Sequence, residues 1–247
     1  MARMRKKKNL IPRMERAEAY IVGAPEEYRG HWREKLGLSA DATLTLELGC
    51  GKGAFAVKTA SGFARRGENS FIIALDKVNE ALVIGMERAM EIDPTGALPV
   101  RFVSADASNL TELFEPGEVN TVCVNFCDPW PNKRHYKRRI TWDSFLKLYA
   151  LLLAPGGTLR FKTDNQPLYD FTLERLEACK FVFVGKSRDL HSTDIPNVTT
   201  EYEDKFSSMG MPIYFAEAIP PRAEDIIVKD LPKKSAAEET EENEAEK

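Results

Sequence analysis

Five apolar segments, each running into an acidic residue, constrain the fold of this chain more than any other feature. The segments expected to be strands are 43–48, 71–75, 100–103, 119–124 and 158–162. The acids at or just beyond their ends are Glu47, Asp76, Asp106, Asp128 and Asp164. Because helical segments separate the strands, the order predicts right-handed crossovers and an α/β fold with a doubly wound, mostly parallel sheet.

The segments between these strands have the apolar spacing of helices. Leu82, Met86 and Met90, for example, recur at helical intervals. The expected helices are 53–64, 79–92, 142–153 and 167–178, and two last strands are expected at 181–184 and 211–216. The run Ala154-Pro155-Gly156-Gly157 should end the third helix and open the fifth strand.

One domain with two unlike ends is expected. The 247 residues, 43% of them hydrophobic, can bury one large core. We predict a basic flexible tail at 1–12, a single domain at 13–229 and an acidic disordered tail at 230–247. The last segment holds seven acids and three lysines, so the net charge of −3 conceals basic clusters at 3–8 and 133–139. Such clusters attract a polyanion, so the pI of 5.8 does not exclude nucleic acid.

The cysteines predict neither a disulfide framework nor a metal site. Cys50, Cys123, Cys127 and Cys179 show no Cys-x-x-Cys spacing, so we expect buried reduced thiols and no bound metal. No stretch approaches the roughly 20 apolar residues of a membrane span, and the basic N-terminus does not continue into a signal-peptide core. The expected location is the cytoplasm.

The first motif is a glycine-rich turn after the first strand. Glycines at 49, 51 and 53 allow a tight turn and a close backbone approach to a ligand. Glu47 beside this turn suits a cationic ligand, although a helix-capping or exposed carboxylate stays open. Asp76 is placed to accept hydrogen bonds from the two hydroxyls of a ribose. Asp106 is placed to accept a hydrogen bond from an adenine amino group. In series these acids describe a site shaped for adenosine.

The second motif is the run from Asn125 to Arg139. It sets the carboxylate of Asp128 and the ring of Trp130 beside lysines and arginines, just past the carboxyl end of a strand. Open α/β sheets bind ligands at that edge. The run can therefore hold a base and its phosphates, while a solvated basic loop after a core strand is the alternative. Trp130 itself is a candidate to stack on a base or to anchor packing.

Four motifs together resemble the bacterial tRNA (guanine-N7)-methyltransferases. They are Glu47-Leu48-Gly49-Cys50-Gly51-Lys52-Gly53, Asp128-Pro129-Trp130-Pro131 with its cations, Phe161-Lys162-Thr163-Asp164-Asn165, and Thr200-Glu201-Tyr202-Glu203 with Lys205 and Phe206. The likeness runs from about residue 43 to 217. The family commonly has lysine directly after the second proline, whereas this chain has Asn132 there and Lys133 next. Cys127 stands where proline or serine is more usual.

The resemblance implies a Rossmann-like class I methyltransferase fold and transfer of a methyl group from S-adenosylmethionine to N7 of a tRNA guanine in the variable loop. It implies a catalytic role for Asp128 and contacts to S-adenosylmethionine from Glu47, Gly49, Asp76, Asp106 and Asp128. The implied substrate-binding residues are Asn132, Lys133, Asp164, Thr200, Glu201, Tyr202 and Glu203. The implied RNA-binding residues are Arg134, His135, Tyr136, Lys137, Arg138 and Arg139. The expected partner is tRNA, and the expected state is a monomer or weak homodimer.

Other readings of the same residues stay open. Asp164 is also suited to cap the following helix, and Glu203 to be a first-turn acid favoured by the helix dipole. The basic cluster at 3–8 is either a solubilising tail or a segment that binds tRNA outside the pocket. At the level of function, the alternatives are an amino-methyltransferase acting on a base of RNA or DNA, an NAD-dependent oxidoreductase, and a non-catalytic RNA-binding protein.

Overall fold

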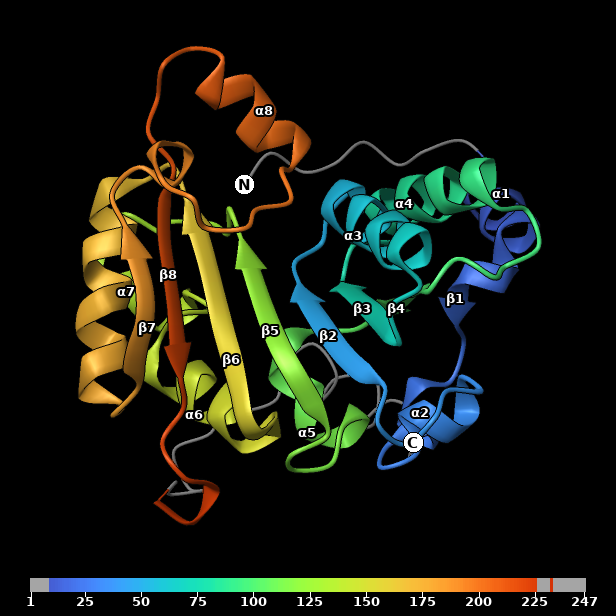
Figure 1. Cartoon of the computed structure of the whole chain (residues 1–247), viewed down its shortest axis with the longest axis horizontal. Coiled ribbons are helices and arrows are strands. Elements are labelled where there is room, and N and C mark those ends of the chain that lie inside the picture. The colour runs from blue at the N-terminus through green and yellow to red at the C-terminus, as the bar shows by residue number, and fades with distance from the viewer. Residues whose placement is uncertain (1–8, 226–231, 233–247) are drawn as a thin grey trace, which may run out of the picture.

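The structure, a computed structural model, describes residues 9–225 and residue 232, and these residues form one eight-stranded sheet (Figure 1). The strands, in the sheet order β1-β4-β3-β2-β5-β6-β8-β7, are β1 Ile21–Val22, β4 Val100–Ser104, β3 Ser70–Asp76, β2 Thr43–Leu48, β5 Val119–Asn125, β6 Leu153–Thr163, β8 Tyr214–Ile219 and β7 Val182–Ser187. All pairings from β1 to β6 are parallel, and β8 is antiparallel to both of its neighbours. The predicted fold class is confirmed.

The described helices occupy both faces of the sheet. They are α1 Leu10–Arg16, α2 Trp32–Lys35, α3 Ala54–Arg66, α4 Asn79–Ile92, α5 Leu110–Leu113, α6 Asp143–Leu152, α7 Gln166–Ala178 and α8 Glu201–Ser207. Successive side chains of β3 show the two layers: Ile73 packs in the cluster shared with α6 and α7, and Ile72 and Ala74 pack in the cluster shared with α3 and α4. This double burial explains why the central strands are almost uninterrupted apolar runs.

The face of the sheet under α3 is covered unevenly. Over β3 and β4 it carries apolar side chains such as Ile72 and Phe102, which pack against α3 and α4. Over β2, β5 and β6 it carries the polar side chains of Thr45, Cys123 and Lys162 instead. Figure 1 shows β5, β6 and β8 with no helix in front of them on that side.

Several predicted boundaries differ from the structure. β6 begins at Leu153, and residues 154–157 bulge out of it opposite Asn120, where the pairing with β5 shifts register. The last strand, predicted at 211–216, is β8 at Tyr214–Ile219. β1, α1, α2 and α5 were not predicted, because a strand of two residues and helices of four to seven residues give too short a periodic signal.

The predicted ends are tested only in part. α1 begins at Leu10, inside the segment predicted to be a flexible tail, while residues 1–8 lie outside the described residues. The predicted acidic tail at 230–247 also lies outside them, apart from residue 232. Within the described part of the chain, no helix has the length and apolar character needed to cross a membrane.

Candidate active site

The acids at the strand ends lie along one edge of the sheet. β2 is hydrogen-bonded between β3 and β5, and Glu47 is level with Ala74 of β3 and Cys123 of β5. Because these strands are parallel, the segments that follow them leave the sheet at the same edge. This edge therefore brings together Glu47, Asp76 and the loop containing Asp128, with Asp106 and Asp164 on the flanking strands.

Residues 49–53, the glycine loop, follow β2 and are held by backbone hydrogen bonds. The N–H groups of Gly49 and Cys50 donate to the Leu75 carbonyl at 2.8 and 3.0 Å. Gly49 and Gly51 have positive φ angles of 69° and 53°, and a Cβ atom at either would meet no atom within 4 Å. The loop thus presents bare backbone to open space, which is what close approach of a ligand requires.

Gly53 has a different role at the start of α3. A Cβ atom there would lie 2.7 Å from the Phe102 ring and 2.8 Å from Cα of Gly85 in α4. The third glycine therefore lets α3 and α4 approach each other closely, while the first two leave room for a ligand.

Glu47 is a buried carboxyl group with an unsatisfied oxygen. Its side chain is 2% exposed, its Oε1 accepts from Nδ2 of Asn125 at 3.1 Å, and its Oε2 has no hydrogen-bond partner. Burial raises the pKa of Glu47 to about 8. A cation beside Oε2 would satisfy the oxygen and stabilise the carboxylate. The alternative of an exposed carboxylate is wrong for this residue.

Asp76 and Asp106 accept hydrogen bonds from nearby backbone. The Asp76 carboxylate accepts from the N–H groups of Gly51 and Val78, both at 2.9 Å, which ties the glycine loop to the end of β3. Asp106 accepts from the N–H and hydroxyl of Ser108 at 2.9 and 2.8 Å, and from Lys77 at 3.2 Å. Each carboxylate oxygen has two lone pairs, so both acids keep capacity for a ligand.

Residues 126–139, the basic loop, carry Asp128 at the edge of the site. Phe126 and Trp130, on either side of it, have positive φ angles of 52° and 38°, which are rare for side chains of this size. Asp128 is exposed, and no described residue donates a hydrogen bond to its carboxylate or forms an ion pair with it. Backbone strain around an exposed acid marks a segment built for a purpose other than stability.

Arg139, which was predicted to contact RNA, has its side chain inside the basic loop. Its side chain is buried, with 3% exposure, and it donates to the carbonyls of Pro129 and Trp130 at 2.8 and 3.2 Å. Its guanidinium also lies 3.7 Å from the centre of the Tyr136 ring. Arg139 therefore shapes the Asp-Pro-Trp-Pro segment from within.

The remaining cations of the basic loop lie on a short 3₁₀ helix at Lys133–Arg138. Its exposed side chains are Lys133, Arg134, Lys137 and Arg138, and Asn132 before it is also exposed. Trp130 is half-buried between Arg138, 5.2 Å from its ring, and His135, whose ring is 5.8 Å away. Tyr136 packs edge-on against Phe171. The aromatic residues thus support a ridge of cations.

Glu203, which was predicted to contact substrate, is buried at the start of α8. It is 0% exposed, and it forms a capping box with Thr200 at the start of α8. Its carboxylate accepts from Lys162 at 2.7 Å and from Asn197 at 2.5 Å. Glu203 therefore occupies the first turn of α8, as the alternative based on the helix dipole expected.

The exposed face of the same helix is open to a substrate. Tyr202 is 46% exposed, and its ring lies 5.2 Å from that of Phe126 in the basic loop. Burial, and after it the neighbouring Asp164 carboxylate, raises the pKa of Tyr202. Asn165, and not Asp164, caps α7, since its side chain accepts from the N–H of Leu168. Asp164 and Tyr202 therefore remain together at the edge of the sheet.

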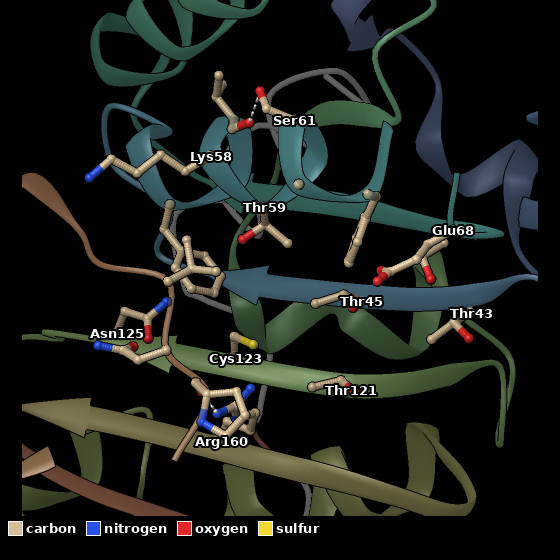
Figure 2. A pocket seen from close by; sticks show the side chains of 18 of the residues that line it. Thr43, Thr45, Lys58, Thr59, Ser61, Glu68, Thr121, Cys123, Asn125 and Arg160 are labelled. Atoms are coloured by element: carbon tan, nitrogen blue, oxygen red, sulfur yellow. Dashed lines mark hydrogen bonds between the residues drawn. The ribbon is translucent and has the colours of Figure 1, made fainter. Parts of the chain in front are cut away.

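A cavity of about 1080 Å³ lies beside this edge, over the polar half of the sheet face. Figure 2 shows Thr45, Cys123, Asn125 and Arg160 from three strands, with Thr59 of α3 across from them. The lining does not include Asp76, Asp106 or Asp128, so the cavity and the acidic edge are neighbours. Asn125 connects them, because it lines the cavity and donates to Glu47.

Sequence reasoning missed four polar residues of this region. Asn125 and Lys162 lie level with each other at the ends of β5 and β6 and contact Glu47 and Glu203, respectively. Lys58 and Arg88 reach α8 from α3 and α4. The first two stand inside motifs that were recognised, but nothing in the sequence distinguishes the last two from ordinary surface cations. Among the described residues, no group of three or more His, Cys, Asp and Glu side chains could hold a metal.

Solved structures with this fold are methyltransferases. One, titled as an antibiotic-related methyltransferase, is 18% identical, covers 81% of this chain and 96% of its own, and gives a TM-score of 0.57. The 16S rRNA methyltransferase KamB is 15% identical, covers 78% and 95%, and gives 0.56. The likeness defines the class: this chain has the fold of the class I methyltransferases.

The sequence comparisons are more specific. A family model described as "Putative methyltransferase" matches residues 41–216. Proteins named tRNA (guanine-N(7)-)-methyltransferase match from Listeria monocytogenes (39% identity, 83% of this chain, 92% of theirs), Bacillus subtilis (38%, 79%, 88%) and Geobacillus kaustophilus (40%, 82%, 90%). The chain therefore belongs to the tRNA (guanine-N7)-methyltransferase family, which confirms the resemblance drawn from its motifs.

Proposed function

We propose that this protein transfers the methyl group of S-adenosylmethionine to N7 of a guanine in tRNA, in the variable loop. The observation that carries the proposal is Glu47, a buried carboxyl group with one unpaired oxygen, which lies two residues before a glycine loop of bare backbone. Membership of the family supplies the reaction. The site supplies a place for a cationic ligand.

The residues of the edge fit the cofactor. Glu47 would hold its cationic end, Gly49 would admit it closely, and Asp76 and Asp106 would accept from its ribose and adenine with their remaining lone pairs. When bound, S-adenosylmethionine supplies a methyl group on a sulfonium, which is activated for transfer to a nucleophile. Glu47 would be ionised in that complex, since a neighbouring cation favours the carboxylate.

Asp128 would orient the guanine. N7 of guanine carries a lone pair and no proton at neutral pH, so the transfer is an in-line displacement that needs no general base, and positioning dominates. The exposed, unpaired Asp128 carboxylate can accept hydrogen bonds from N1 or N2 of the base. Asp164, which follows β6, and Tyr202 of α8 are neighbours, and they would contact the same base.

The exposed cations of the basic loop would bind the phosphates of the tRNA. Phosphate contacts position the RNA, and the pocket at the strand ends selects the base. Lys133 and Asn132 are both exposed, so both are available to the substrate. Binding would weaken as salt rises, because each phosphate contact releases counterions.

The test is incubation of the protein with methyl-labelled S-adenosylmethionine and bulk tRNA, followed by separation of the nucleosides. Label in N7-methylguanosine supports the proposal. Label in a methylated amino group would show instead that the protein is an amino-methyltransferase. Binding of tRNA with no label in any nucleoside would leave a non-catalytic RNA-binding protein, and preferential binding of NAD would indicate an oxidoreductase.

A further inference from the structure

α8, which carries the Thr-x-Tyr-Glu motif, is attached to the sheet by a buried ion pair and by Phe206, which packs against the cluster of Leu190, Ile213 and Phe215. Lys162 of β6 is 4% exposed, and its ammonium donates to Glu203, to Oδ1 of Asn197 and to the Val198 carbonyl at 2.7, 2.9 and 2.9 Å. Nε2 of His191 lies 3.0 Å from the other oxygen of Glu203. Because Lys162 and Glu203 are both buried and hydrogen-bonded to each other, this contact fixes one side of α8.

The opposite side of α8 is attached by exposed ion pairs to the two helices that flank the glycine loop. Lys58 of α3 donates to Asp204 at 2.9 Å and to Thr199 at 3.1 Å. Arg88 of α4 donates through Nη2 to Glu201 at 2.5 Å. The side chains of these pairs are between 28% and 56% exposed, so they can break without exposing a buried charge.

Arg88 differs from Lys58 in one respect. Its second nitrogen, Nη1, donates to the backbone carbonyl of Lys52, inside the glycine loop, at 3.2 Å. One planar guanidinium therefore joins the loop that faces the cofactor to the helix that faces the substrate. A lysine at this position could not make both bonds with the same fixed geometry.

We propose that Arg88 is a positioning residue that couples cofactor binding at the glycine loop to tRNA binding at α8. A cofactor seated against the loop would hold the Lys52 carbonyl in place, and through Arg88 it would hold Glu201 and the exposed face of α8. Linkage makes the effect reciprocal: bound tRNA strengthens cofactor binding by the same factor. The inference rests on the proposed function, since it takes these two surfaces as the cofactor and substrate sites.

The experiment measures the dissociation constant of S-adenosylhomocysteine by calorimetry, with and without saturating bulk tRNA, and that of tRNA with and without S-adenosylhomocysteine. The wild-type protein should show tighter binding of each in the presence of the other. Arg88→Ala should reduce this coupling factor about fivefold, while both dissociation constants measured alone change by less than about twofold. Arg88→Lys should give an intermediate value, because it keeps the pair with Glu201 and loses the double contact.

Arg29→Ala is the matched control. Arg29 also bonds a glutamate, Glu115, and a backbone carbonyl, that of Thr111, but it does so away from both surfaces. It should leave the coupling factor unchanged. Arg88→Lys is the variant to use if Arg88→Ala lowers the melting temperature, because it keeps a cation at this position and still loses the double contact.

The outcomes separate the inference from the proposed function. Wild-type protein that binds neither ligand would contradict the proposed function itself. Wild-type protein that binds both ligands without coupling, or coupling that survives unchanged in both Arg88→Ala and Arg88→Lys, would overturn the role of Arg88 alone.

Discussion

The glycine loop and the basic loop lie at the same edge of the sheet and are built in opposite ways. The glycine loop is shaped by backbone hydrogen bonds and by Asp76, next to the buried Glu47. The basic loop is shaped by a buried side chain, Arg139, and leaves Asp128 and most of its cations exposed. The spacing of glycines in the sequence predicts the backbone geometry of the first loop. The run of cations in the second loop does not indicate which cationic side chain is buried.

The two loops would also have different roles in the proposed reaction, because the glycine loop would bind the cofactor and the basic loop would bind the RNA. A site of open backbone beside one buried acid holds its ligand by fixed geometry, and its contribution should be insensitive to salt. A ridge of exposed cations binds by charge, and its contribution should fall as salt rises. Each prediction below changes one side of this contrast.

The largest effect is expected at Asp128. Asp128→Asn should lower single-turnover methylation by about 100-fold or more, because a misplaced base loses its in-line geometry. Stability should not change, since no described residue pairs with this carboxylate. Rapid-quench methylation assays and thermal unfolding measure the two quantities. Asp41→Asn, an exposed acid before β2 at the other edge of the sheet, is the control, and near wild-type single turnover in Asp128→Asn would exclude the assigned role.

A smaller effect is expected for Glu47→Gln. The amide cannot become an anion beside a cationic ligand, so S-adenosylmethionine should bind about 10- to 100-fold more weakly. In the wild-type protein, binding should strengthen as the pH rises toward 8, because the pKa of about 8 means that the carboxyl group must lose a proton to pair with the cation. Calorimetry across pH 6–9 tests this, and equal pH dependence in both proteins would contradict it.

The same residue has an opposite effect on the unliganded protein. Its folded pKa of about 8 is raised above the usual 4.5, so its contribution to stability is complete below pH 4.5 and is lost as the pH rises to 8. Glu47→Gln should therefore stabilise the free protein at pH 8–9 relative to the wild type. Urea unfolding at pH 5 and pH 9 measures the difference, which should be larger at pH 9.

Substitutions of the neighbouring Arg138 and Arg139 should have different effects on the free energy of unfolding. Arg139→Ala removes two bonds to the Pro129 and Trp130 carbonyls and should cost on the order of 2 kcal/mol of unfolding free energy, with loss of methylation. Arg138→Ala removes an exposed cation and should leave unfolding unchanged. Chemical denaturation of both variants is the measurement. Equal stability of the two would show that Arg139 does not support the loop.

The smallest effect is expected for single exposed cations. Lys133→Ala and Lys137→Ala should each weaken tRNA binding by a few-fold and reduce the slope of log affinity against log salt by about 1. Filter binding between low and moderate salt measures the slope. Glu47→Gln is the comparison, since it should leave that slope unchanged. If the lysine variants also keep the wild-type slope, the ridge does not bind phosphate.

The sequence was a good guide to the fold because the central strands are buried on both faces and the glycines mark one turn. It was a weaker guide to the site. In the sequence, Glu203 and Arg139 resemble ordinary surface charges. In the structure both are buried, because Glu203 pairs with Lys162 and Arg139 donates to the Pro129 carbonyl. The contacts of Arg88 join it to Lys52, 36 residues away, and to Glu201, 113 residues away, and no local pattern encodes such contacts.

The most direct test is a crystal structure with S-adenosylmethionine bound, because two adjacent sites compete for it. We predict that the cationic end of the ligand lies within hydrogen-bond distance of Oε2 of Glu47, with its ribose at Asp76. A ligand found instead in the cavity between α3 and β6, with that oxygen still unpaired, would contradict the account.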